Sequence, residues 1–417
     1  MWSVPRSGLP WPSRCYTGFV RQRDVELVTL QACVDRRLDQ FRTLDVASDD
    51  VFRAVHADFL QDRNFNADVG RALSVNRDVL RIDLLSTSGG NATWGKQRGV
   101  ARKDLQRSSE TGAAELGPQY PGDPPFRAQM RRHQSWYRAT RLRVPPGTGP
   151  TSSSATHYGN MLTADDAERG ANFLTPAIFD QVQRRISAGG GVEPFRCLHN
   201  TLSSQPLCFN LFGPLAGDLD LARQLLGATM PGEIGEVTSI EFEVAPAPAR
   251  EYLGDRTAFD ALVRYTRPGG TPAFVAIEVK LTEPFTQKAY DGPKYRTLTS
   301  SAGAPFSPER VAELADIRWN QLWRNHLLVE AVKRHPSTPQ ETVGRLAVVR
   351  HPRDEEARAA VDGYRRLLVD PHASFLDWPL DALVEGWRTM RLDGPSMAWL
   401  NELQLRYLDL KASVRQQ

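Results

Sequence analysis

The chain of 417 residues is long enough for two or three domains of about 150 residues each. Its 41% hydrophobic and 24% charged residues are typical of a globular protein and exclude a fibre or a wholly disordered chain. The formal net charge of +3 permits a nucleic-acid partner without requiring one. No apolar run approaches the ~18 residues of a transmembrane helix, and the first thirty residues lack the apolar core of a secretory signal. Four cysteines without C-x-x-C spacing indicate neither a zinc ribbon nor a disulfide framework. We therefore expect a cytoplasmic protein without a membrane partner.

Residues 1–118 form the first predicted segment. Leu27, Leu30, Val34 and Leu38 recur at helical spacing and predict an amphipathic helix. The periodicity then fades into small and polar residues. This N-terminal extension is therefore either a small, mostly helical domain or a partly disordered segment, and the sequence leaves both alternatives open.

Residues 119–154 form a second segment, rich in proline and glycine at both ends. Its middle, residues 126–144, contains six arginines, interleaved aromatic side chains and no acid. Such a strip can follow a nucleic-acid backbone, and the candidate DNA-binding residues are Arg131, Arg132 and Arg138. The alternative, a surface helix whose aromatic side chains dock on the main domain, is favoured.

Residues 155–417 are predicted to form the main domain. The patterns indicate helices over 165–183 and 202–212, the second ending at Gly213 and Pro214, and then three strands over 237–244, 259–265 and 274–281. A helix over 308–335, a strand over 344–350 and helices over 357–369, 379–390 and 396–410 follow. This order predicts an α/β fold with a β-meander at its centre.

The predicted strand over 274–281 is apolar except for two charged residues near its end, Glu278 and Lys280. Glu278 and Lys280 share one face, because side chains alternate along a strand. A buried carboxylate needs a cation, a hydrogen-bond partner or water. Asp260 opens the preceding strand, and antiparallel pairing would bring it beside Glu278. Two carboxylates with a backbone carbonyl between them suit Mg²⁺; the alternative is a salt bridge between Glu278 and Lys280 on an exposed strand.

The Asp260…Glu278-Val279-Lys280 pattern resembles the PD-(D/E)xK nuclease superfamily. Five stretches are similar to a bacterial family of restriction-endonuclease-like proteins: Gly170–Pro176, Leu202–Gly213, Gly254–Asp260, Ile277–Lys280 and Leu322–Leu327. The resemblance implies a restriction-endonuclease-like αβββαβ core with a mixed central sheet flanked by helices. It also implies that Asp260, Glu278 and the carbonyl of Val279 bind Mg²⁺, for which Mn²⁺ can substitute, and that Lys280 acts on the attacking water.

Further candidates surround this pattern. Many members of the superfamily add an acid from the first core helix, where this chain has Gln205 instead; Glu243 and Asp255 are possible substitutes. Gln321 and His326 lie on the helix that follows the third strand, and Arg318 and Arg324 of the same region are candidate DNA contacts. A lone helical histidine is more often a core or surface residue than a catalytic one.

The expected function is a Mg²⁺-dependent endonuclease that hydrolyses DNA phosphodiester bonds through a metal-activated water. One alternative is a catalytically silent nuclease fold that binds DNA or a protein partner in a bacterial defence system. A glycosidase, which also uses two carboxylates, is a third and less favoured class. The sequence leaves a homodimer open.

Overall fold

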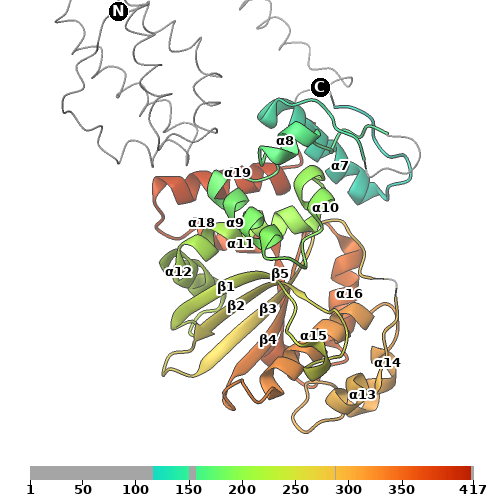
Figure 1. Ribbon diagram of the computed structural model, residues 1–417, viewed down its shortest axis with the longest axis vertical. Helices are drawn as coiled ribbons and strands as arrows, with labels where there is room; N and C mark the ends of the chain where they lie inside the picture. The colour runs from blue at the N-terminus through green and yellow to red at the C-terminus, as the bar shows by residue number, and fades with distance from the viewer. Residues whose placement is uncertain (1–115, 150–155, 287, 415–417) are drawn as a thin grey trace, which may run out of the picture. The chain divides into compact units, whose positions relative to one another are not determined.

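The computed structural model describes residues 116–149, 156–286 and 288–414 (Figure 1). The chain divides into two units, Met1–Glu110 and Thr111–Gln417, and every described residue belongs to the second. The predicted N-terminal extension therefore lies outside the described residues, apart from residues 116–118. None of the helices in the described ranges combines the length and the apolar character that crossing a membrane requires.

A five-stranded sheet forms the centre of the second unit, with its strands in sequence order (Figure 1). The first three strands pair antiparallel, and the last two are parallel to their neighbours. The structure thus confirms the predicted mixed sheet and α/β class. The strands are β1 (Glu236–Val244), β2 (Phe259–Thr266), β3 (Pro272–Lys280), β4 (Val343–Arg350) and β5 (Phe375–Pro379).

Helices precede the sheet, connect its parallel strands and end the chain. The segment before β1 contains α7 (Pro125–Tyr137), a π-helical turn (Arg138–Leu142), α8 (Ala164–Glu168), α9 (Pro176–Ser187), α10 (Pro194–His199), α11 (Ser204–Gly217) and α12 (Leu219–Thr229). Between β3 and β4 lie α13 (Pro293–Thr299), α14 (Val311–Leu314) and α15 (Asn320–Arg334). The remainder are α16 (Glu355–Arg365), α17 (Pro371–Ser374), α18 (Leu380–Arg388) and α19 (Gly394–Tyr407).

Each face of the sheet is covered by its own hydrophobic cluster, because β3 alternates apolar side chains between the two sides. Val275, Ile277 and Val279 pack with α9, α11, α12, α18 and α19. Phe274 and Ala276 pack on the opposite face with α13, α15 and α16. By this alternation, Glu278 and Lys280 belong to the α15 face.

Helix α11 departs from the sequence prediction, because it continues through Pro214 to Gly217 instead of ending at Gly213. A proline inside a helix leaves the carbonyl four residues earlier without its N–H donor. Here that carbonyl, of Asn210, accepts the indole N–H of Trp399 at 2.8 Å. A contact from α19, far away in the sequence, therefore compensates for the missing hydrogen bond.

Further elements differ from the sequence prediction, which did not include α10, α12, α13 and α17. The predicted helix over 165–183 is interrupted, because Gly170 adopts φ +76° after α8 and Thr175 caps the new helix α9. The predicted helix over 308–335 is likewise divided between α14 and α15. Strand β5 was not predicted at all; only five residues long, it carries little periodicity of its own.

The basic segment over 126–144 is a docked helix, as the favoured interpretation had it. In α7, His133 contacts the carbonyl oxygen of Leu405 at 2.9 Å, and Gln134 donates to that of Arg406 at 2.8 Å. Arg131 is buried and bonds Asp123 and Asn160, while buried Arg138 donates to carbonyl oxygens of its own chain. These two arginines are buried in contacts with their own chain, whereas Arg132 is partly exposed.

Candidate active site

The end of β3 carries a buried ion pair. The Lys280 Nζ lies 2.9 Å from Glu278 Oε1, and the two residues are 7% and 4% exposed. The sequence placed these side chains on one face of the strand, and the structure brings them into contact there. The pair is a salt bridge, but in the interior rather than on the exposed strand that the alternative interpretation assumed.

Helix α15 supplies two amides to the same carboxylate. Gln321 donates from Nε2 to Glu278 Oε1, and Asn325 donates from Nδ2 to Oε2, each at 2.7 Å. The two amides are four residues apart and therefore lie on one face of the helix. Three N–H donors thus satisfy both oxygens of Glu278, which is what allows a charge to remain in so buried a position.

Asp260 meets the end of β3 from the neighbouring strand. In the antiparallel register Ala261 pairs with Ile277, so Asp260 comes opposite Glu278 one position further along. The Asp260 Oδ2 accepts the backbone N–H of Val279 at 2.7 Å, and no described residue donates to Oδ1. Burial raises the pKa of Asp260 well above its usual range, with a further rise from the charge of Glu278.

The loop after β3 closes over Lys280. The ring of Phe285 lies 5.0 Å from the ammonium, and the backbone N–H of Thr286 donates to Gln321 Oε1 at 2.6 Å. Burial alone would lower the pKa of Lys280, but the charge and the hydrogen bond of Glu278 outweigh it, and the pKa is raised. Lys280 is therefore a charged group in this arrangement.

Glu243 lies at the end of β1, close enough for its charge to act on those of Asp260 and Glu278. It is 7% exposed, and its Oε1 accepts a hydrogen bond from Gln205 Nε2 at 2.5 Å. Burial raises its pKa to about 7, even though the hydrogen bond from Gln205 and the charge of Arg196 act in the opposite direction. The structure thus joins Gln205 and Glu243, which the sequence named as separate alternatives.

The other sequence candidates lie away from this cluster. Asp255 binds Thr257, Tyr295 and Arg324; burial alone would raise its pKa, but these partners lower it. Arg324 also stacks on the ring of Tyr290 at 3.9 Å. These side chains connect the loop before β2 to α13 and α15 rather than to the acids of β2 and β3.

His326 and Arg318 have local partners as well. His326 is fully buried with its Nδ1 3.0 Å from the hydroxyl of Tyr364, and burial lowers its pKa to about 3. It is a neutral core residue, in agreement with the general expectation for a lone helical histidine. Arg318 is exposed and pairs with Asp316 at 2.8 Å.

Sequence reasoning missed two polar residues of this region. Asn325 could have been found from its position one helical turn after Gln321. Glu283, three residues after Lys280, accepts the backbone N–H groups of Leu281 and Thr282 and, at 2.7 Å, that of Ser204 at the start of α11. Glu283 thereby ties the end of β3 to α11, a connection that only the tertiary structure reveals.

The donor atoms at the end of β3 fit a hard divalent cation. Asp260 and Glu278 offer carboxylate oxygens, and the carbonyl of Val279 points to the same strand edge as its N–H, which Asp260 accepts. Oxygen ligands of this kind suit Mg²⁺. Within residues 116–149, 156–286 and 288–414 no three histidine, cysteine or acidic side chains lie close enough to form a complete metal cluster by themselves. A carbonyl and water would have to complete the set.

A fold of this topology, with an acid at the start of β2 and an acid and a lysine at the end of β3, defines a class of nuclease-like proteins. The family model of the PD-(D/E)XK nuclease superfamily matches residues 121–409. The chain belongs to that superfamily, and the match covers the whole sheet and all the residues of the cluster. No curated protein and no solved structure matches the chain.

Proposed function

We propose that the protein is a metal-dependent endonuclease that hydrolyses DNA phosphodiester bonds, with Asp260, Glu278 and Lys280 as its catalytic residues. Membership of a nuclease superfamily supports the reaction class. The observation that carries the proposal is the meeting of these three side chains at the start of β2 and the end of β3. The Lys280 ammonium is 2.9 Å from Glu278, and Asp260 accepts the backbone N–H of Val279 between them.

Asp260, Glu278 and the carbonyl of Val279 would hold Mg²⁺ or Mn²⁺. The chemistry that such an ion supplies is polarisation of a phosphoryl oxygen and activation of water. The side chains have separate tasks. Gln321 and Asn325 fix the orientation of Glu278 through their two hydrogen bonds. Lys280 carries N–H donors and a positive charge, and it would orient the attacking water and offset charge on the phosphate.

A cleavage assay with the full-length protein tests this function. Supercoiled plasmid and linear duplex DNA are incubated with MgCl₂, with MnCl₂ or with EDTA. We expect metal-dependent nicking by the wild type and a loss of at least a hundredfold in E278Q and K280M, since each removes a group that contacts the reacting atoms. E241Q and K411M, which remove an exposed acid and an exposed lysine, serve as matched controls and should cut normally.

A catalytically silent nuclease fold is the second candidate. The observation that favours it is that Glu278 already has all its hydrogen bonds and its counter-charge from its own chain. Such a protein would retard DNA in a gel, with an affinity that falls steeply as salt rises, but would give no metal-dependent product. Wild-type protein that binds DNA and never nicks it refutes the nuclease and supports this module.

A further inference from the structure

Glu243 is the glutamate of the cluster that lacks an ion pair to any described residue. Glu278 is paired with Lys280, whereas the described residues provide Glu243 only with the neutral amide of Gln205, and only at Oε1. No ion pair to Glu243 is present in the part of the chain that the structure describes. A carboxylate that is 7% exposed and has no cationic partner is costly to maintain.

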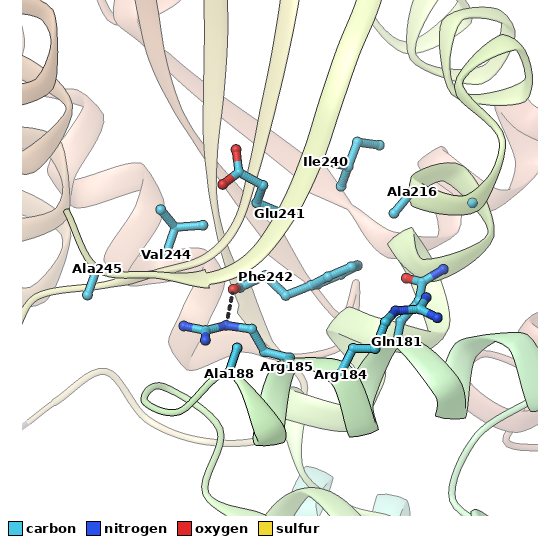
Figure 2. A pocket seen from close by; sticks show the side chains of 11 residues that line it. Gln181, Arg184, Arg185, Ala188, Ala216, Ile240, Glu241, Phe242, Val244 and Ala245 are labelled. Atoms are coloured by element: carbon cyan, nitrogen blue, oxygen red, sulfur yellow. Dashed lines mark hydrogen bonds between the residues drawn. The ribbon is translucent and has the colours of Figure 1, made fainter. Parts of the chain in front are cut away.

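The backbone holds Glu243 in an unusual conformation. Its φ is +51°, in the left-handed region that residues with a side chain rarely adopt. Arg185 of α9 donates to the carbonyl oxygens of Phe242 and Glu243, both at 2.8 Å (Figure 2 shows the first of these bonds). Arg185 therefore fixes the backbone at the end of β1, not the carboxylate.

A glycine makes room for the same side chain. A Cβ atom at Gly191 would collide with the Cβ of Glu243. Gln205 donates to Gly191 O at 3.3 Å and accepts the backbone N–H of Glu193 at 3.1 Å, so its amide is oriented when it bonds Glu243. Strained backbone that its surroundings over-determine is concentrated at functional sites, and here three segments meet around one buried carboxylate.

We propose that Glu243 is the third acidic residue of the active site and that its negative charge acts on the divalent ion bound by Asp260 and Glu278. The proposal rests on the proposed function and adds to it a residue from β1. Three carboxylates and one ammonium have a net charge of −2 when all are ionised, which a divalent cation complements. Arg185 and Gln205 are positioning residues, because they act on the site through Glu243.

Calorimetric titration of the metal-free full chain with MnCl₂ tests the proposal without requiring activity. E243Q keeps the size of the side chain and an oxygen that can accept from Gln205, but it removes the charge. We expect its affinity for Mn²⁺ to fall about tenfold, which corresponds to about 1.4 kcal/mol. E241Q is the matched control, because Glu241 is two residues earlier on β1, exposed and paired with Arg264; it should bind Mn²⁺ like the wild type.

Each outcome decides the matter. E243Q that binds Mn²⁺ within twofold of the wild type overturns the proposal, even if the wild type cuts DNA. A wild type that binds no Mn²⁺ at millimolar concentration also overturns it. A wild type that binds Mn²⁺ tenfold more tightly than E243Q but never nicks DNA supports the role of Glu243 while the proposed hydrolysis fails. If E243Q does not fold, E243A is titrated instead. If neither variant folds, Glu243 is required for folding, and the proposal is overturned.

Discussion

Glu243 makes the stability of the metal-free protein depend on pH in a direction unusual for an acid. Burial, with the charge of Glu278, raises its pKa to about 7 from an ordinary value of 4.5, against the effects of Gln205, Arg196 and Arg185. Between these values the folded state keeps a proton that the unfolded state has released. The free energy of unfolding therefore decreases as pH rises from about 4.5 to about 7. The difference between the two pKa values corresponds to about 3 kcal/mol.

The perturbation that removes this effect is E243Q, and the assay is urea unfolding in EDTA at pH values from 5 to 8. Because the charge of Glu243 also raises the pKa of Asp260, E243Q weakens that contribution in the same direction. His326 and His351 titrate in the opposite sense, since burial lowers the pKa of each to about 3, so stability falls as pH falls. They are common to both proteins and cancel in the difference. As pH rises from 5 to 8, we expect the free energy of unfolding of E243Q to increase by about 2–3 kcal/mol relative to that of the wild type. The pH dependence of E241Q should equal that of the wild type. A difference that stays constant with pH refutes the assignment of a raised pKa to Glu243.

Three other substitutions probe the surroundings of the site by urea unfolding. K280M leaves Glu278 buried without its cation and should lower the free energy of unfolding by about 3–5 kcal/mol. The double variant E278Q/K280M should recover most of this loss. A loss below about 1 kcal/mol in K280M contradicts a buried ion pair. Between pH 6.5 and 4.5, the free energy of unfolding should fall by about 2–3 kcal/mol less in H326F than in the wild type, because burial lowers the pKa of His326 to about 3. A pH profile equal to that of the wild type contradicts this lowered pKa. G191A should destabilise more than G190A by at least about 1 kcal/mol, because both glycines have positive φ but only a Cβ at 191 meets Glu243; equal losses would show that Glu243 needs no such space.

The first four strands could be predicted because each carries its signal within a few residues, whereas the short β5 could not. Alternation in β3 placed Glu278 and Lys280 on one face, and the glycine-rich turn before Pro272 set the antiparallel return to Asp260. What the sequence could not supply depends on contacts between distant segments. The continuation of α11 through Pro214 depends on Trp399, and the docking of Arg131 depends on Asp123 and Asn160.

The candidate site shows the same division. The two strand acids and the lysine follow from periodicity, and Asn325 could have been inferred from its helical spacing to Gln321. Glu283 required knowledge of where α11 lies against the end of β3. Basic composition alone left two alternatives open, since a run of arginines looks alike whether it faces phosphate or its own carbonyl oxygens. Arg138, which donates to Gly159 O at 2.6 Å, illustrates the second case.

The two buried glutamates of the cluster differ in how their charge is balanced, and this difference bears on whether the fold is an active enzyme. Glu278 is neutralised from within by Lys280, so an ion that approached it would have to compete with an existing partner. Among the described residues, only the neutral amide of Gln205 bonds the Glu243 carboxylate, so its charge favours the binding of a cation. A silent scaffold under selection for stability alone would gain by replacing Glu243 with a neutral residue. A buried Glu243 carboxylate with a left-handed backbone and no ion pair to any described residue, beside Asp260 and Glu278, is therefore the feature of this structure that best agrees with a site that holds metal.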